Sequence, residues 1–209
     1  MRRSIKIGLI ALGIGSAVTL GFFVDVVGRI QSLVNERETE ENPFKPPTVP
    51  LYAPTDPPLA VKMFFPSTAG EPLLGAEDET IFKSSELQNQ AKQVLQKLLD
   101  GPANDALMPS FSPDTKINEV FISEDGTAYI DFSNSVAASF QGGMLNEQAA
   151  IYSVVNSLTY NLPEIKQVRI LIGGAEKETL AGHCLLLLPL ELDLNLTDTL
   201  PQEEEPHAQ

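Results

Sequence analysis

The sequence predicts an α+β fold, with two helices packed on one face of a small mixed β-sheet. Three observations lead to this prediction. Short segments in which apolar and polar residues alternate indicate half-buried strands, and two longer segments with apolar residues three or four positions apart indicate helices. Glycine or proline separates these segments. Their order is β-α-β-β-α-β plus an extra C-terminal strand, which suits a two-layer sandwich.

The first half of the expected domain holds a strand, a loop and a helix. Residues 59–66, LAVKMFFP, are predicted to form a strand that ends at the proline. We expect a long loop next, in which the acidic run at 77–79 is solvated. Apolar residues then recur at helical spacing over 87–99, and the Gly101-Pro102 pair ends this helix.

The second half begins with a predicted hairpin over 117–133. Its turn is Asp125-Gly126, because this pair tolerates the positive φ angles of a two-residue turn. A second helix is expected from about residue 144 to residue 162, where proline follows, and a further strand over 167–172.

The charge and cysteine content exclude two classes of protein. The formal net charge is -14, and an acidic body repels the phosphate backbone, so no nucleic-acid partner is expected. Cys184 is the only cysteine, which rules out an intrachain disulfide and hence a disulfide-rich scaffold.

The N-terminal segment predicts a membrane anchor. Residues 7–24 are an uncharged run of eighteen, and about twenty apolar residues cross the hydrocarbon layer. Three cations precede the run, so we expect a cytoplasmic N-terminus at 1–6, a transmembrane signal anchor at 7–27 and a body outside the cytoplasm. The alternative is a cleaved signal peptide, with Gly15 and Ala17 as small residues at the processing site.

The regions on either side of the expected domain differ from it in composition. Residues 28–58 are acidic and then proline-rich, which predicts a semi-rigid spacer between the membrane and the domain. The domain itself is expected over 59–196. The acidic tail at 197–209 has little to bury, and we expect it to be disordered.

The sequence contains none of the common motifs for nucleophilic, zinc or phosphate-binding sites. His183 and Cys184 are adjacent, and on a strand they would point to opposite faces, so they cannot act as base and nucleophile for one another. The acidic run at 77–79 lacks calcium-loop spacing. We therefore expect no catalytic, metal-binding or cofactor-binding residue, and no small-molecule substrate.

Glu147 is a carboxylate on the apolar stripe of the second helix, beside Met144 and Ile151. In a structural interpretation, it folds back on the unpaired backbone N–H groups of the first helical turn. In a functional interpretation, it contacts a partner. An alternative function pairs it with Asp131 in a small cell-wall-acting hydrolase, as in glycoside hydrolysis, although the chain has no Trp to hold a sugar.

The segment HCLLLLPLELDLNL is predicted to be the extra C-terminal strand, interrupted at Pro189. In such a strand Leu186 and Leu188 lie on one side, and the neighbouring leucines lie on the other. One pair must then be covered by the proline-rich spacer, by a partner or by a second copy of the domain. We expect Leu186 and Leu188, together with Glu147, to form an interaction surface.

Five stretches also match a known family in order and spacing. They are VKMFFP, LLDGP, INEVFISEDGTAYIDFS, NEQAAIYSVVNSLTYNLPEIKQVRILIGG, and TLAGH followed by Pro189-Leu190. With these stretches the body, over most of 59–190, resembles the GerMN domain, also called the sporulation and spore germination domain, as in GerM and LpqB-like proteins. This chain departs from GerM in having one such domain instead of two. Its anchor is an expected transmembrane helix instead of a lipid.

The resemblance implies a bacterial, non-catalytic module that works through protein contacts in an assembly of the cell envelope. No catalytic residue comes with the family. We therefore expect a single-pass protein of the cytoplasmic membrane, whose extracytoplasmic domain acts as a binding or scaffold module. Its partner is another envelope protein or a second copy of itself.

Overall fold

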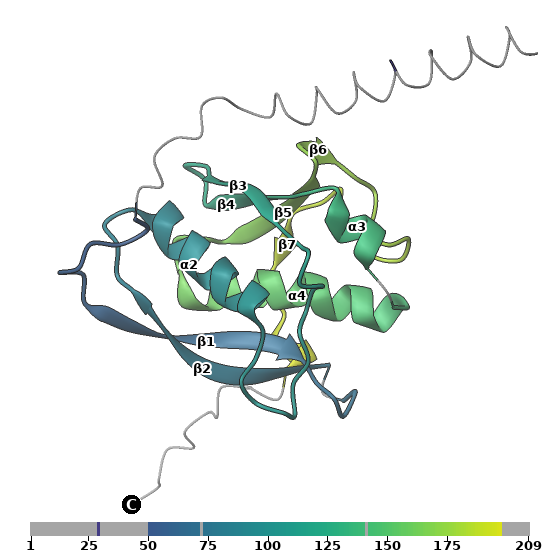
Figure 1. Cartoon of the computed structure of the whole chain (residues 1–209), viewed down its shortest axis with the longest axis horizontal. Helices are drawn as coiled ribbons and strands as arrows, with labels where there is room; N and C mark the ends of the chain where they lie inside the picture. Colours follow the sequence, from purple (N-terminus) through teal and green to yellow (C-terminus); the bar gives the residue numbers. More distant parts are fainter. Residues whose placement is uncertain (1–28, 30–49, 72, 141, 198–209) are drawn as a thin grey trace, which may run out of the picture. The chain divides into compact units, whose positions relative to one another are not determined.

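The computed structural model describes residue 29 and residues 50–71, 73–140 and 142–197 (Figure 1). The chain divides into two compact units, Met1–Val49 and Pro50–Gln209, and only Arg29 is described in the first. The elements of the second unit are, in order, β1 (Pro58–Pro66), β2 (Leu74–Phe82), α2 (Leu87–Asp100), β3 (Ile117–Ile122), β4 (Thr127–Phe132), α3 (Ser135–Ser139), α4 (Met144–Asn161), β5 (Gln167–Ile172), β6 (Ala175–Glu176), β7 (Leu190–Glu191) and the 3₁₀ helix η1 (Leu194–Leu196).

The α+β fold class is confirmed, and so are both long helices and the hairpin of β3 and β4. The hairpin turn differs from the prediction. Ser123 donates its backbone N–H to the carbonyl of Thr127 at 3.0 Å, which leaves a three-residue loop instead of a two-residue turn. Gly126 takes a φ of 88° in this loop, the region that glycine enters without steric cost.

The acidic run at 77–79 lies in β2, so the prediction of a solvated loop is wrong. Strands β1 and β2 pair in antiparallel register from Pro58 with Phe82 to Pro66 with Leu74. Each carboxylate of the run has a partner: Lys62 for Asp78, Lys97 for Glu79, and the N–H groups of Ala103 and Asn104 for Glu77. These partners lie far away in sequence, which is why the run by itself resembled a loop.

The strands form two sheets where one was expected. Besides the β1-β2 hairpin, a five-stranded sheet has the order β3-β4-β5-β6, with β7 also pairing with β5. Strands β3 and β4 are antiparallel, whereas β4 and β5 are parallel. The parallel pair requires a crossover, which α4 supplies.

Helices α2 and α4 form the middle layer, between the β1-β2 hairpin and the five-stranded sheet (Figure 1). One core cluster joins all three layers, for example through Met63 of β1, Leu95 of α2, Ile130 of β4 and Val154 of α4. The helices therefore cover one face of the five-stranded sheet, as predicted. The β1-β2 hairpin covers the opposite side of the helices.

Helix α4 is buried on more than one side, and its polar side chains bind the backbone of neighbouring segments. The side-chain amide of Asn161 accepts the N–H of Lys62 and donates to its carbonyl, both at 2.7 Å. Asn156 makes the same pair of bonds with the backbone of Asp193, at 3.0 and 2.8 Å. These contacts satisfy backbone groups that have no strand partner there, which buried polar groups require.

The expected transmembrane anchor at 7–27 lies outside the described residues, as do the spacer apart from Arg29 and residues 50–58, and the expected tail at 197–209 apart from Thr197. Thr197 is buried and forms a bridge with Leu74, so the prediction of a disordered tail is wrong at this residue. Within the described part of the chain, no helix combines the length and the apolar character needed to span a membrane.

Candidate functional site

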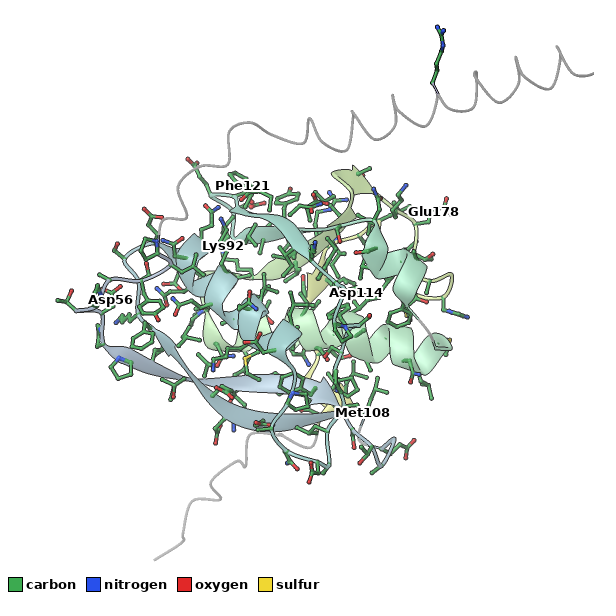
Figure 2. The ribbon with its side chains drawn as sticks, viewed as in Figure 1. Asp56, Lys92, Met108, Asp114, Phe121 and Glu178 are labelled. Atoms are coloured by element: carbon green, nitrogen blue, oxygen red, sulfur yellow. The ribbon has the colours of Figure 1, made fainter. Side chains whose placement is uncertain are left out.

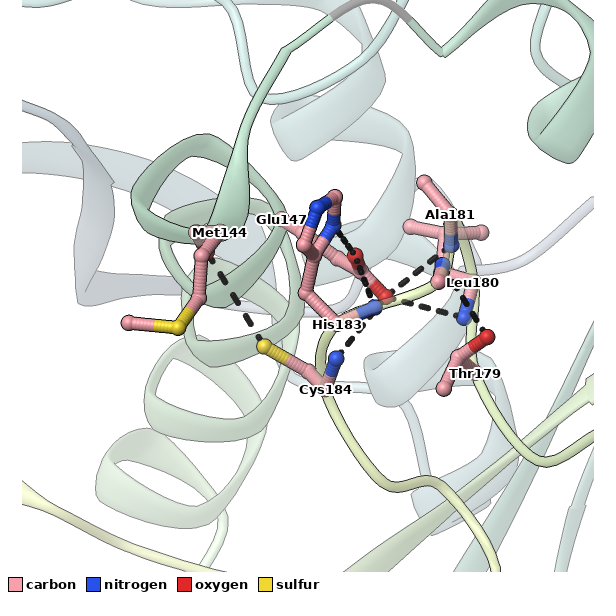
Figure 3. Close-up of polar contacts among 8 residues, drawn as sticks. Met144, Glu147, Thr179, Leu180, Ala181, His183 and Cys184 are labelled. Carbon is pink, nitrogen blue, oxygen red and sulfur yellow. Dashed lines mark hydrogen bonds and ion pairs between the residues drawn. The ribbon is translucent and has the colours of Figure 1, made fainter.

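Among the described residues of the second unit, the carboxylate of Glu147 is the centre of a highly connected polar site. Its side chain is fully buried in the first turn of α4. Oε1 accepts the backbone N–H groups of Leu180, Ala181 and Cys184 at 3.1, 2.9 and 3.2 Å. Oε2 accepts the N–H of His183 at 2.9 Å and lies 2.8 Å from the Nδ1 atom of its ring (Figure 3). We call this arrangement the Glu147 lock.

The lock shows that the structural interpretation of Glu147 was right about burial and wrong about the partner. The carboxylate binds the segment at 180–184 and not the N–H groups of its own helical turn. The N–H of Glu147 itself donates to the carbonyl of Gly143 at 3.1 Å. An acid on an apolar stripe signals a buried partner, but only the fold brings the segment at 180–184 to it.

The pKa of Glu147 lies below its ordinary value. Burial acts to raise the pKa, but the hydrogen bonds from Ala181, Cys184 and His183 stabilise the ionised form and outweigh it. Glu147 is therefore a carboxylate at neutral pH, with both oxygen atoms occupied. Both oxygen atoms of this buried carboxylate hold the segment at 180–184 against α4.

The structure does not bring Asp131 together with Glu147. Asp131 alternates along β4 with Ile130 and Phe132, whose side chains are buried against the helices. Its own side chain therefore lies on the opposite face of the sheet, where it accepts hydrogen bonds from Asn118 and from the backbone of Gly174. The carboxylate pair expected for a hydrolase is not formed.

His183 and Cys184 do not act on one another either. The ring of His183 turns to Glu147, whereas the Cys184 Sγ atom lies 4.0 Å from the carbonyl oxygen of Met144 (Figure 3). Burial and the charge of Glu147 raise the pKa of the Cys184 thiol, so the thiol is protonated at neutral pH and a poor nucleophile. Among the described residues, no cluster of His, Cys, Asp and Glu could hold a metal ion.

The leucines after the lock are not arranged as predicted. Leu186 is 3% exposed and belongs to the core, whereas Leu185 and Leu188 are 54% and 63% exposed. Leu186 and Leu188 therefore do not share a face, because the backbone from 183 to 189 is irregular and the strand β7 begins only afterwards. Leu186 donates its N–H to the carbonyl of Glu178 at 2.8 Å.

Exposed apolar side chains gather in the two segments that the lock joins. Leu185, Leu187 and Leu188 follow the segment at 180–184, and Met144 and Leu145 precede Glu147 on α4. All five are exposed, and the two segments meet where Cys184 contacts the carbonyl of Met144. We call these five residues the leucine surface. Sequence reasoning named only Leu188 of this set as an interacting residue, because it assumed a regular strand.

A separate open groove of about 300 Å³ lies beside β2 and α2. Tyr52 stacks on Phe82 at its wall, with ring centroids 4.2 Å apart. The side chain of Gln93, also in the wall, is bound to the backbone N–H and carbonyl of Phe82. The side-chain amide of Gln93 is therefore already bonded within the domain.

Comparison with known proteins identifies relatives of this domain. Residues 62–178 match the model of the family described as Germane, sporulation and spore germination. The first GerMN domain of the sporulation protein GerM from Bacillus subtilis is 26% identical, with a TM-score of 0.52, over 64% of this chain and 97% of that one. The tandem GerMN domains of the same protein give 26% identity and a TM-score of 0.52, over 65% of this chain and 46% of that one. No curated protein sequence matches the chain.

Proposed function

Because this chain belongs to the sporulation and spore germination (GerMN) family, we propose that its domain is a non-catalytic binding module of the cell envelope. Residues 59–196 act outside the cytoplasm, and they bind a partner protein through the leucine surface. The similarity to a domain of a Bacillus subtilis sporulation protein supports a sporulation-related role.

One observation carries this proposal, namely that a fully buried carboxylate fixes an irregular segment whose leucines are exposed. Glu147 accepts four backbone N–H groups from residues 180–184, and charge-assisted bonds of this kind are about twice as strong as neutral ones. A fixed backbone presents Leu185 and Leu188 without the entropy loss of ordering a mobile loop on binding. Clustered exposed apolar side chains are typical of contact sites.

Membrane attachment is the second part of the proposal. The uncharged run at 7–24 and the three cations before it support a single-pass anchor with the N-terminus in the cytoplasm. External protease should then release residues from about 30 onward in cells stripped of their wall. Recovery of the full-length chain in the soluble cytoplasmic fraction would contradict this topology.

Photo-crosslinking in the native organism tests the contact surface. A photoreactive amino acid replaces Leu188, and a matched variant carries it at Phe121, which is 57% exposed on the five-stranded sheet. We expect the variant with the photoreactive amino acid at position 188 to crosslink to a partner protein. The variant with it at position 121 should give no crosslinked product or a different one. Identical products at both positions would mean that the leucine surface is not the contact site.

A further inference from the structure

Most of the charged side chains around the leucine surface are acidic. Residues 50–197 contain 19 acidic and 8 basic residues. Glu178 and Glu191 are exposed at the two ends of the leucine segment, and the carbonyl of Glu178 accepts the N–H of Leu186. Lys177 is the one cation between residues 175 and 193. The leucine surface is thus an apolar area whose border carries two exposed glutamates, Glu178 and Glu191, and one exposed cation, Lys177.

The cation nearest to the leucine backbone is already neutralised. Arg169 donates to the carbonyl of Leu187 at 2.8 Å and pairs with the carboxylate of Glu176 at 2.9 Å. It therefore holds the segment in place and does not offset the charges of Glu178 and Glu191. An approaching molecule meets apolar side chains first and carboxylates at the border.

This charge pattern disfavours three occupants. A second copy bound through the same surface forms a two-fold contact in which each acidic border faces the other, and like charges oppose association. The acidic runs at 36–41 and 203–205 of the chain itself are repelled for the same reason. So is a membrane surface of anionic lipid.

The backbone geometry favours recognition through side chains. The N–H of Leu186 and the carbonyl of Leu187 are already bonded within the domain, so a partner strand cannot pair with them. At the centre of the edge strand β3, the backbone of Val120 is also unavailable to a partner strand. Its carbonyl accepts a hydrogen bond from the Gln88 side chain at 2.5 Å, and the N–H of Val120 donates to the Glu119 carboxylate at 3.2 Å. A helix that lays an apolar stripe on the leucines fits these constraints, whereas an added strand does not.

We propose that the leucine surface binds a cationic amphipathic helix of a partner protein, with its apolar stripe on the leucines and its lysine or arginine residues beside Glu178 and Glu191. This inference rests on the proposed function and adds the chemical class of the partner. The apolar stripe of the partner helix provides affinity. Its lysine and arginine residues provide orientation and selection against acidic segments.

Two model peptides test the charge requirement. Both are amphipathic helices with leucine at the same positions, and the polar positions hold lysine in one and glutamate in the other. The full chain is placed in nanodiscs of zwitterionic lipid, with empty nanodiscs as the blank, and binding is followed by fluorescence anisotropy of the labelled peptide. We expect the lysine peptide to bind at least about tenfold more tightly, with an affinity that falls as salt is added.

Three variants locate the binding. The double change Glu178→Lys with Glu191→Lys should reverse the preference between the peptides. Leu188→Ser should weaken binding of the lysine peptide, and Phe121→Ser, an equally exposed apolar residue elsewhere, should leave it unchanged.

The outcomes separate this inference from the proposed function. If both peptides bind with equal affinity and Leu188→Ser weakens both, the leucine surface is the contact site but the partner need not be cationic, which overturns this inference. Self-association that Leu188→Ser abolishes would overturn the inference and show that a second copy binds the leucine surface. Attachment to vesicles of anionic lipid would overturn it in favour of a membrane surface. Binding of neither peptide overturns the cationic helix, whereas the proposed function then stands or falls on crosslinking from Leu188.

Discussion

Glu147 and His183 lie 36 residues apart in the sequence, yet Oε2 of Glu147 accepts the backbone N–H of His183 at 2.9 Å and lies 2.8 Å from its ring Nδ1 atom. This relationship ties the first turn of α4 to the segment that leads into the exposed leucines. The stability of that segment therefore depends on one ionised side chain.

Replacing Glu147 by glutamine should destabilise the protein strongly. The glutamine amide has one acceptor oxygen, and its NH₂ group faces backbone N–H donors, so buried donors lose their partner. We expect a loss of about 2–4 kcal/mol in the free energy of unfolding, and a larger loss for Glu147→Leu. Urea denaturation measures both. The matched variant Glu164→Gln changes an exposed glutamate and should stay within about 0.5 kcal/mol of the wild type. Equal stability of all variants would refute the lock.

The lock should make stability depend on pH in the acid range. The folded-state pKa of Glu147 is below its ordinary value of 4.5, so the carboxylate contributes stability that is complete above that value and is lost as the pH falls through the folded-state pKa. Glu79 and Asp125 are shifted in the same direction. The test is therefore the difference between the wild type and Glu147→Gln, which should shrink as the pH falls below 4.5. A difference that stays constant with pH would mean that folding does not shift the pKa of Glu147.

Cys184 should react slowly with alkylating reagents in the folded protein. Burial and the charge of Glu147 raise the pKa of its thiol, so little thiolate is present near neutral pH. The rate of alkylation by iodoacetamide should be well below that of the unfolded chain at pH 8. It should rise in Glu147→Gln, because this variant loses the charge and loosens the segment. A fast reaction in the folded wild type would show that the thiol is neither shielded nor shifted.

The bonds between Asn161 and Lys62 should contribute measurably to stability. In Asn161→Ala, the N–H and the carbonyl of Lys62 lose their partner on α4, and we expect a loss of about 1–3 kcal/mol in the free energy of unfolding. Asn146→Ala removes an exposed asparagine from the same helix and serves as the control, with a change within about 0.5 kcal/mol. Similar losses in both variants would assign the effect to the helix and not to the contact with β1.

The sequence determined most of the secondary structure. The spacing of apolar residues identified α2 and α4, and alternation identified β4 and β5, because these patterns are set by the geometry of a helix or a strand and can be recognised within one segment. The same local information placed Glu147 on a buried stripe. It also excluded a disulfide, since there is one cysteine.

Only the tertiary structure decided where the polar groups find partners. Strand β2 is recognised from its pairing with β1 and from the partners of its acidic run at 77–79, which lie in other elements. Glu147 needed a partner, but the segment at 180–184 reaches it only after the chain has passed through β5 and β6. Leu186 is buried and Leu188 exposed because two hydrogen bonds set an irregular path. The N–H of Leu186 donates to the carbonyl of Glu178, and the guanidinium of Arg169 donates to the carbonyl of Leu187. Long-range hydrogen bonds leave no periodic trace in a sequence, and these bonds fixed the shape of the candidate contact surface.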